Sequence, residues 1–387
     1  MSNRRQQKLF IDASVLTVRH KSGIAKVTLS LIQELCQQEQ GRQIVIFAPF
    51  DTARAVKDSV SYPVKKIPIP DILFRALKKY DLLPPLDLFL GRGIYFFPNY
   101  WNSRLILSHS ITMVYDLGFL LFPSFVETKN RRYLSRNISR WTHRTSRVVT
   151  ISEYVASQLR TELALPPAKV KVMYLGVDQK HFKPVNENDI KILRSKLGLN
   201  KRYILTVGNI EPRKGLDTLV EAYRALDATL HDAYSLVIVG AAGWNNESIE
   251  EQIHDIQQAG LDIRVLSGIS DRQLPALYSG ASVYVQASRY EGFGLTPLEA
   301  AACGAPLLLS DIPVFREVFG SDADYAPPDN YAAFQNSLSR ILSKEHPSAN
   351  RLYRSALPRR FTWPGAVSQL LDITNETAGQ SGGTLLK

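Results

Sequence analysis

Short apolar runs, rich in β-branched and aromatic side chains, recur through the first part of the chain and alternate with segments of helical spacing. The runs predict strands at 8–14, 43–49, 94–99, 110–116, 147–152 and 169–175. Apolar residues spaced by three or four positions predict helices, most clearly at 24–36, 125–143 and 153–163. Such alternation is typical of parallel sheets covered by helices.

A polar stretch at 178–190, DQKHFKPVNENDI, interrupts this rhythm and is the candidate domain linker. The alternation then begins again. Strands are predicted at 202–208, 235–241, 263–268, 282–288 and 306–311, and helices at about 215–226, 246–259, 271–279 and 296–303. The sequence therefore predicts two α/β domains, and functional residues are expected just after strands, at the carboxyl ends of the sheets.

Composition supports two globular domains in a reducing compartment. At 387 residues and 45% hydrophobic, the chain exceeds what one core usually supports. Cys36 and Cys303 are far apart in the sequence and fit neither a disulfide framework nor a zinc pattern. The apolar run before Asp12 is too short for a signal peptide, and no stretch is long enough to span a bilayer. We expect a cytoplasmic protein that can also lie peripherally at the anionic inner face of the membrane.

Positive charge is concentrated in the first half. Residues 1–180 carry 27 Lys+Arg against 13 Asp+Glu, and residues 181–387 carry 20 against 23. A solvated surface, an anionic membrane, an anionic acceptor and nucleic acid all remain possible partners of this charge. No helix-turn-helix, zinc or RNA-binding signature accompanies it, which disfavours nucleic acid. The segment 73–91, LFRALKKYDLLPPLDLFLG, mixes apolar and basic residues and could enter a membrane interface or pack between domains.

Two segments of the second half carry the candidate chemistry. In SRYEGFGLTPLEAAACGAPLLLSD (288–311) a strand end, a glycine-containing turn and a helix start follow one another, which is a favourable place for an anion such as a diphosphate. Glu291 and Glu299 flank this helix start. In VGNIEPRKGLDTLVEAY (207–223), Arg213 and Lys214 precede a helix, where cations are unfavourable unless an anion lies near. Capping and solvated surface roles are the structural alternatives for all four.

These segments resemble glycosyltransferase family 4, and the resemblance covers nearly the whole chain. Glu291 to Glu299 is similar to the family's E-x7-E element, and Gly208 to Lys214 to its G-x-x-E-P-R-K element. Further similar segments, in the same order and spacing, are SGIAKVTLSLIQEL (22–35), YDLGFLLFP (115–123), VTISEYVASQL (149–159), YLGVD (174–178), IVGAAGW (238–244) and SGISDRQLPALYSGA (267–281). The chain is identified as a member of this family.

The resemblance implies a GT-B fold, in which two facing Rossmann-like domains with parallel sheets enclose an interdomain cleft. Residues 1–178 would bind the acceptor and 179–365 the nucleotide-sugar, while a helix within 366–387 would pack back on the first domain before a flexible tail. From the residues alone, the tail is expected after Thr374.

The resemblance also implies residue roles in donor binding. Lys214 and Arg213 would hold the diphosphate, Glu299 the ribose hydroxyls and Glu291 the transferred sugar. Further donor-binding positions would be the amides of Phe293, Gly294 and Leu295 at the phosphates, the Gly268–Ile269 turn at the nucleobase, and Gly23, Gly208 and Asn209 near the phosphates.

Two departures from the family pattern affect these roles. Many relatives have Arg at the position of Asn209, so the phosphate site would depend on Arg213 and Lys214. Many have His at the position of Tyr115, which could contact the acceptor or simply pack in the core. Asp116 is the preferred catalytic carboxylate on the acceptor side, with turn capping as the alternative.

The implied reaction is hexosyl transfer with retention of anomeric configuration, without metal or cofactor, to a glycan or lipid-linked acceptor in surface polysaccharide or glycolipid biosynthesis. Mannose or rhamnose is favoured, and GDP-mannose, dTDP-rhamnose and UDP-sugars remain candidate donors. Alternatives are a non-catalytic family member, an epimerase or phosphorylase, and a nucleic-acid-binding module. A dehydrogenase is disfavoured because Asp12-Ala13-Ser14 replaces a complete G-x-G-x-x-G after the first strand.

Overall fold

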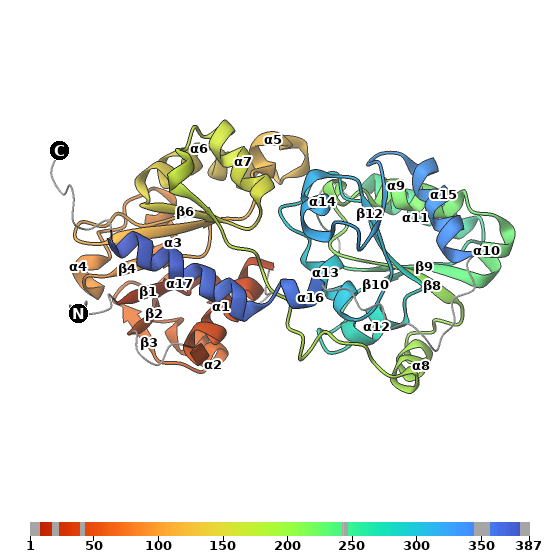
Figure 1. Cartoon of the computed structure of the whole chain (residues 1–387), viewed down its shortest axis with the longest axis horizontal. Coiled ribbons are helices and arrows are strands. Elements are labelled where there is room, and N and C mark those ends of the chain that lie inside the picture. Colours follow the sequence, from red (N-terminus) through yellow and green to blue (C-terminus); the bar gives the residue numbers. More distant parts are fainter. Residues whose placement is uncertain are drawn as a thin grey trace. The chain divides into compact units, whose positions relative to one another are not determined.

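The computed structural model describes residues 8–17, 23–38, 43–241, 243, 247–343 and 357–379. They form two compact units (Figure 1). Unit 1 takes the described residues up to Leu121, then Thr128–Gly176 and the residues from Trp363 onward. Unit 2 takes Phe122–Glu127 and Val177–Thr362, as far as they are described.

Unit 1 is built on a seven-stranded sheet in the order β3-β2-β1-β4-β5-β6-β7, and every pairing in it is parallel. Its strands are β1 (Leu9–Asp12), β2 (Ile44–Pro49), β3 (Val64–Ile67), β4 (Ile94–Phe97), β5 (His109–Val114), β6 (Arg147–Thr150) and β7 (Val170–Val172). In the central register Leu9 pairs with both Ile44 and Ile94. All four residues of β1 are buried, as expected for a strand covered on both faces.

Helices cover both faces of this sheet (Figure 1). They are α1 (Gly23–Gln38), α2 (Ala53–Val60), α3 (Asp71–Lys79), α4 (Asp87–Leu90), α5 (Gly118–Leu121), α6 (Thr128–Arg144), α7 (Glu153–Glu162) and α17 (Trp363–Gly379). The 3-10 turns η1 (Ser14–Thr17) and η3 (Pro167–Lys169) complete the unit.

The last described helix, α17, belongs to unit 1 although it follows unit 2 in the sequence. It packs along α1 and against β4 and β5 (Figure 1). The Tyr174 amide donates to Gln369 Oε1 at 3.0 Å, and Lys171 pairs with Glu376 at 2.6 Å. The chain therefore crosses from unit 2 back to unit 1 before its end.

Unit 2 repeats the architecture with a six-stranded parallel sheet in the order β10-β9-β8-β11-β12-β13. Its strands are β8 (Arg202–Val207), β9 (Tyr234–Val239), β10 (Ile263–Leu266), β11 (Val283–Gln286), β12 (Leu307–Ser310) and β13 (Asp324–Ala326). Its helices are α8 (Glu187–Lys196), α9 (Leu216–Arg224), α10 (Ala228–Ala233), α11 (Glu247–Gln258), α12 (Leu274–Gly280), α13 (Leu295–Ala302), α14 (Pro313–Phe319), α15 (Tyr331–Leu342) and α16 (Leu357–Arg360), with the 3-10 turns η2 (Pro123–Phe125) and η4 (Pro212–Lys214). One core cluster of α9, α11, α15 and strand residues holds the unit together.

The structure corrects three sequence expectations. The expected linker 178–190 contains the start of α8, because Asn186 caps that helix by accepting a hydrogen bond from the Asp189 amide at 2.9 Å. The tail expected after Thr374 is helical to Gly379, and residues 380–387 lie outside the described residues. The expected helix 125–143 begins only at Thr128, after η2.

Residues 122–127 belong to unit 2 although the sequence places them within the first domain. The Phe122 ring packs on Tyr290 of unit 2, with ring centroids 4.9 Å apart. The hydrophobic pattern did not predict that this segment belongs to unit 2, because its aromatic residues are equally compatible with either domain.

Candidate active site

The turn after β8 carries the two basic residues and is held by backbone geometry. Gly208 follows β8 with φ +154°, η4 contains Arg213 and Lys214, and Gly215 is the N-cap of α9 with φ +61°. A Cβ on Gly215 would lie 2.0 Å from the Ala287 carbonyl oxygen, so only glycine fits this approach. The Arg289 amide also donates to the Arg213 carbonyl at 2.9 Å. The loops after β8 and β11 are therefore locked together.

Glu291 lies between the two cations. Arg213 Nη1 donates to Glu291 Oε2 at 2.7 Å, and Lys214 Nζ donates to Glu291 Oε1 at 2.7 Å. Arg213 Nη2 also donates to Glu211 Oε1 at 2.7 Å. We call Glu211, Arg213, Lys214 and Glu291 the charge cluster. It contains two acids and two bases in hydrogen-bonding contact.

The environment of Glu291 keeps it ionised. Burial opposes the charged carboxylate, but the adjacent Arg213 and Lys214 charges and their hydrogen bonds outweigh it and lower the pKa of Glu291 from 4.5 to about 2. Glu291 is only 8% exposed. It is therefore an anion throughout the physiological pH range.

A buried polar chain fixes Glu291 from the side of the sheet. Ser288 Oγ donates to Glu291 Oε1 at 2.9 Å, Gln286 Nε2 donates to Ser288 Oγ at 2.7 Å, and Tyr284 OH donates to Gln286 Oε1 at 2.7 Å. These side chains come from β11 and the residues immediately after it. The carboxylate is thus positioned by the strand itself and not only by the cations.

The N-terminus of α13 follows Glu291 closely. Gly294 is the N-cap with φ +109°, and no side chain caps the helix there. A Cβ on Gly294 would lie 2.9 Å from the Phe315 ring, and Phe293 packs on Phe361 with centroids 5.5 Å apart. The first N–H groups of a helix have no intrahelical acceptor and carry partial positive charge. This turn can therefore accept an anion on its backbone.

Glu299 lies inside α13, in the turn of helix that follows the N-terminus. It is half-buried, and Tyr278 OH of α12 donates to its Oε2 at 3.0 Å. Burial, followed by the Glu299 charge, raises the pKa of Tyr278 well above its ordinary value, so this hydroxyl stays a donor. The carboxylate of Glu299 is thus oriented by a neutral phenol.

The other donor-binding candidates of unit 2 lie on loops after neighbouring strands. Asn209 is exposed directly after β8, and Gly208 lies beside the Lys214 side chain, 3.4 Å from an added Cβ. Gly268, with φ +73°, and half-buried Ile269 follow β10. Because β10, β9, β8 and β11 are adjacent and parallel, all these loops leave the same edge of the sheet. The structure brings these candidates together at that edge.

The candidates of unit 1 lie on its own loops. Gly23 is exposed at the start of α1. Tyr115 is buried after β5, and its hydroxyl donates to the Pro98 carbonyl at 2.9 Å. Burial raises the pKa of Tyr115 far above its ordinary value. Asp116 Oδ1 accepts from the Gly118 amide at 2.9 Å, as a turn-capping carboxylate does. In the structure, the Tyr115 side chain packs in the core and the Asp116 side chain caps a turn.

Sequence reasoning missed the supports of the site. Glu211 is 2% exposed and balances Arg213, and Tyr278 orients Glu299. Arg289 joins the two loops, because its guanidinium donates to Asp217 at 2.6 Å and 3.0 Å and to the Pro212 carbonyl at 2.6 Å. The proline after Glu211 was the available signal, since Pro212 is the first residue of η4 and Glu211 is its N-cap.

The described residues contain neither a membrane-spanning helix nor a cluster of metal ligands. None of their helices is long and apolar enough to cross a membrane. No group of three or more His, Cys, Asp or Glu among them could hold a metal ion.

Two family models match this chain. Residues 21–181 match the model "Glycosyltransferase Family 4", and residues 189–357 match "Glycosyl transferases group 1". Among curated proteins, the O-antigen chain mannosyltransferase B of Escherichia coli is 25% identical over 283 residues, 72% of this chain and 73% of that protein. The serotype-specific mannosyltransferase WbdA of E. coli is 28% identical over 95% of this chain, which spans only 45% of its length.

Solved structures share the fold. HepE of Anabaena, in complex with UDP and glucose, superposes with a TM-score of 0.68 at 17% identity, covering 96% of this chain and 99% of that one. WaaG, a glycosyltransferase involved in lipopolysaccharide biosynthesis, superposes with a TM-score of 0.63 at 14% identity, covering 97% of this chain and 100% of that one. Both units thus have the parallel α/β architecture of GT-B enzymes. The two model matches together cover residues 21–181 and 189–357, and they show that the chain belongs to the glycosyltransferases of family 4.

Proposed function

We propose that this chain transfers a hexose, with mannose favoured, from a nucleotide-sugar to a glycan acceptor in surface polysaccharide biosynthesis. The charge cluster at the start of α9 and α13 is the observation that carries the proposal, because its cations adjoin a helix N-terminus suited to a diphosphate. The names of similar proteins, O-antigen and lipopolysaccharide core mannosyltransferases, support mannose and a polysaccharide acceptor.

The donor is held by unit 2 in this proposal. Lys214 and Arg213 bind the diphosphate together with the amides of 293–295. Glu299, oriented by Tyr278, accepts hydrogen bonds from the ribose hydroxyls, and the 268–269 turn contacts the base. These contacts account for the clustering of candidates at one edge of the sheet.

Chemistry follows from where charge develops. The bond from the anomeric carbon to the diphosphate breaks, and the Arg213 and Lys214 cations stabilise the departing anion; one such contact is worth on the order of 2–4 kcal/mol. Glu291 holds both cations in place and presents its negative charge near the sugar. The acceptor hydroxyl oxygen bonds to the anomeric carbon from the face that the diphosphate leaves, and the leaving phosphate takes the acceptor proton. The sugar therefore retains its anomeric configuration. No metal takes part in this route, so chelators leave the rate unchanged.

Donor binding tests the proposal directly. In a thermal-shift assay with GDP, UDP, dTDP and the corresponding nucleotide-sugars, compounds with one of the three bases should raise the melting temperature. A ligand at 100 times its Kd stabilises the folded protein by about 2.7 kcal/mol. Lys214→Met should abolish this shift, whereas Lys196→Met, the same change at an exposed position of α8, should preserve it. Transfer to a mannose-terminated oligosaccharide is then followed by mass spectrometry. Binding without transfer would favour a non-catalytic family member, and no binding would overturn the proposal.

We also propose that unit 1 contacts an anionic membrane where the acceptor is presented. Eight of the twelve exposed large hydrophobic residues identified among the described residues lie between positions 72 and 107. Six of them form what we call the apolar rim: Tyr80, Leu82, Leu88, Phe89, Ile106 and Leu107. The rim is one connected surface, because Asp87 of α4 accepts from the Ile106 and Leu107 amides and Asp81 pairs with Arg104 at 3.5 Å.

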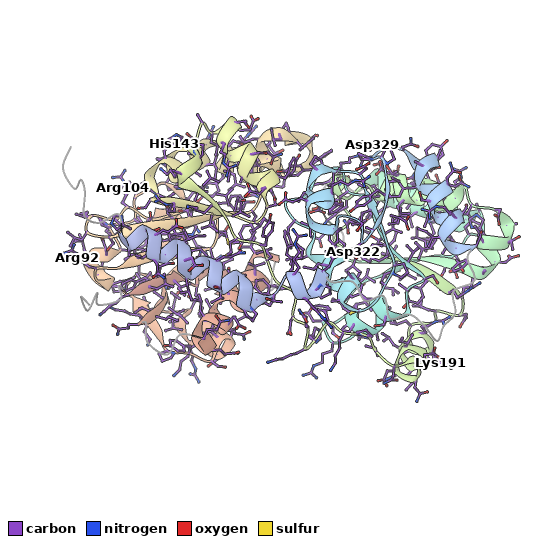
Figure 2. All side chains as sticks on the ribbon, in the orientation of Figure 1. Arg92, Arg104, His143, Lys191, Asp322 and Asp329 are labelled. Carbon is purple, nitrogen blue, oxygen red and sulfur yellow. The ribbon has the colours of Figure 1, made fainter. Side chains whose placement is uncertain are left out.

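Basic side chains accompany the rim. Arg92 and Arg104 are exposed, and Figure 2 shows both at the outer surface of unit 1, on the side where Figure 1 labels α4. Each Lys or Arg near an anionic leaflet contributes about 1 kcal/mol. We expect flotation with vesicles containing phosphatidylglycerol and not with neutral phosphatidylcholine. The pair Leu88→Ser and Phe89→Ser should abolish it, and equal flotation with both vesicle types would contradict the proposal.

A further inference from the structure

Unit 1 contains two cavities of about 220 Å³ each that share Lys78 and Asn99 in their walls. Both cavities lie near the residues that follow β1 and β4. These residues are at the carboxyl edge of the sheet. Open parallel sheets bind their ligands at this edge. Each cavity is smaller than the roughly 300–1,000 Å³ of sites for drug-sized ligands, so each suits a single small ring. None of the candidate residues taken from the family motifs lines either cavity.

Lys78 lines both cavities, and its ammonium can donate hydrogen bonds to a ligand. Its Nζ lies 4.1 Å from the centroid of the Trp101 ring, a cation–π contact. Within the described part of the chain, its ammonium forms no hydrogen bond and no ion pair within 4.0 Å. Burial lowers the pKa of Lys78 to about 8, although the nearby Asp12 charge opposes this shift. An ammonium has three donors, and these can serve a ligand.

Asp71 supplies an acceptor on the same helix. It lies seven residues before Lys78 on α3, so both side chains share one face of the helix, and both line the second cavity. Asp71 Oδ2 pairs with Arg75 at 2.6 Å. Its Oδ1 is buried and has no hydrogen-bond partner among the described residues, and the residue is only 9% exposed. A buried carboxylate oxygen in this position requires a donor.

The first cavity adds aromatic walls and carboxamides. Tyr100, Trp101, Tyr133 and Trp141 contribute to its lining together with Asn130. Asn130 and the shared Asn99 each offer donors and an acceptor. Apolar and aromatic walls with a few convergent polar groups of both kinds suit a pyranose, because each hydroxyl both donates and accepts while the ring carbons are apolar.

We propose that these two cavities form the acceptor-saccharide site, in which Lys78 donates to a ring hydroxyl, Asp71 Oδ1 accepts from one, and Asn99 contacts both of two adjacent sugar rings. This inference rests on the proposed function, since the saccharide is the acceptor of the transfer. It assigns recognition to α3 and the loop after β4, which the family motifs leave without a role.

Saccharide binding tests the site without turnover. Methyl α-mannopyranoside and an α-linked mannotriose are titrated to 50 mM into the full chain saturated with the nucleoside diphosphate that binds best. Binding is followed by tryptophan fluorescence, since Trp101 and Trp141 line the first cavity. We expect a saturable signal with the wild type. Lys78→Met and Asp71→Asn should each raise the saccharide Kd about tenfold or more, as loss of a hydrogen bond to a charged group does.

Lys79→Met is the matched control, because Lys79 follows Lys78 on α3, is exposed, and lies over the Tyr80 ring at 5.6 Å. It should leave the saccharide Kd unchanged. Nucleoside diphosphate binding, measured by calorimetry, should be unchanged in all three variants, and hydrogen exchange on peptides from β1 and β4 should show that unit 1 is folded in each. Trp101→Phe should remove most of the fluorescence change and keep binding detectable by saturation-transfer NMR.

The outcomes separate this inference from the proposed function. Loss of nucleotide binding by the wild type would contradict the donor proposal. Normal nucleotide binding with no saturable saccharide response, or with equal saccharide Kd values for Lys78→Met and Lys79→Met, overturns the acceptor site. A response to inorganic phosphate in place of the saccharides would show an anion site and would also overturn it.

Discussion

Replacing Glu291 by Gln should destabilise unit 2 at neutral pH, and this destabilisation should disappear as the pH is lowered. The neutral amide keeps the shape of the side chain and removes the charge that Arg213 and Lys214 surround at 2.7 Å. The Glu291 pKa is lowered from 4.5 to about 2 in the folded protein. A difference of that size corresponds to about 3 kcal/mol of stability above the unfolded pKa. The Glu291 side chain is 11% exposed, so solvent screens little of it.

The sign of the pH dependence follows from proton binding. Between pH 4.5 and 2 the unfolded chain binds a proton at this carboxyl and the folded chain does not, so acid favours unfolding. The contribution is complete above the unfolded pKa and is lost as the pH falls through the folded pKa. The difference between wild type and Glu291→Gln should therefore be about 3 kcal/mol at pH 7, about 2.5 at pH 4 and about 1.5 at pH 3.

Hydrogen exchange measured by mass spectrometry on peptides from β8 and β11 reports the opening free energy of unit 2. Comparing both proteins at the same pH cancels the intrinsic exchange rate. Glu251→Gln, at an exposed position of α11, is the control and should change the opening free energy by less than about 0.5 kcal/mol. A Glu291→Gln difference that is equal at pH 7 and pH 3, or below about 1 kcal/mol at pH 7, would refute the reasoning.

Two further substitutions test the backbone and the ribose contact. Gly215→Ala should destabilise unit 2 by more than about 2 kcal/mol in hydrogen exchange, because its Cβ would meet the Ala287 carbonyl at 2.0 Å. The control Gly198→Ala, at a position with φ +65° and no atom within 4 Å, should destabilise unit 2 by only about 1–2 kcal/mol. Equal destabilisation by both variants would contradict the packing argument. Glu299→Gln should weaken nucleotide binding about tenfold by calorimetry and change stability by less than about 1 kcal/mol; unchanged nucleotide affinity would remove Glu299 from the ribose site.

Most of the sheet framework could be predicted from the sequence, because buried parallel strands are continuous apolar runs. β8 and β11 fall within the predicted ranges, and β9 begins one residue before its range. Strands with less burial were missed. β3 has the sequence VKKI with both lysines exposed, and β13 has only three residues, so neither shows an apolar run. The hydrophobic pattern therefore finds every strand in the middle of the two sheets, and among the edge strands it finds β7 and β10 but misses β3 and β13.

The candidate site was predicted residue by residue through motifs, but its internal contacts were not. Glu291, Arg213 and Lys214 were expected to serve a donor separately, and the structure shows them bound to one another. These contacts join residues 77 and 78 positions apart, so no local pattern encodes them. The cavities beside Lys78 were likewise invisible, because they combine α3 with the loop after β4 and with α6.

The charge cluster need not break when a diphosphate binds, and this gives a last prediction. Lys214 Nζ has three donors, and Glu291 takes one, so Lys214 can donate to a phosphate while Glu291 holds it. If Glu291 acts on the donor by positioning Lys214, then removing either residue removes the same interaction. In calorimetry with the nucleoside diphosphate, the double variant Glu291→Gln, Lys214→Met should bind about as weakly as Lys214→Met alone, a coupling of about 1–3 kcal/mol. Additive losses would mean that Glu291 and Lys214 act on the diphosphate independently, and the positioning role of Glu291 would be wrong.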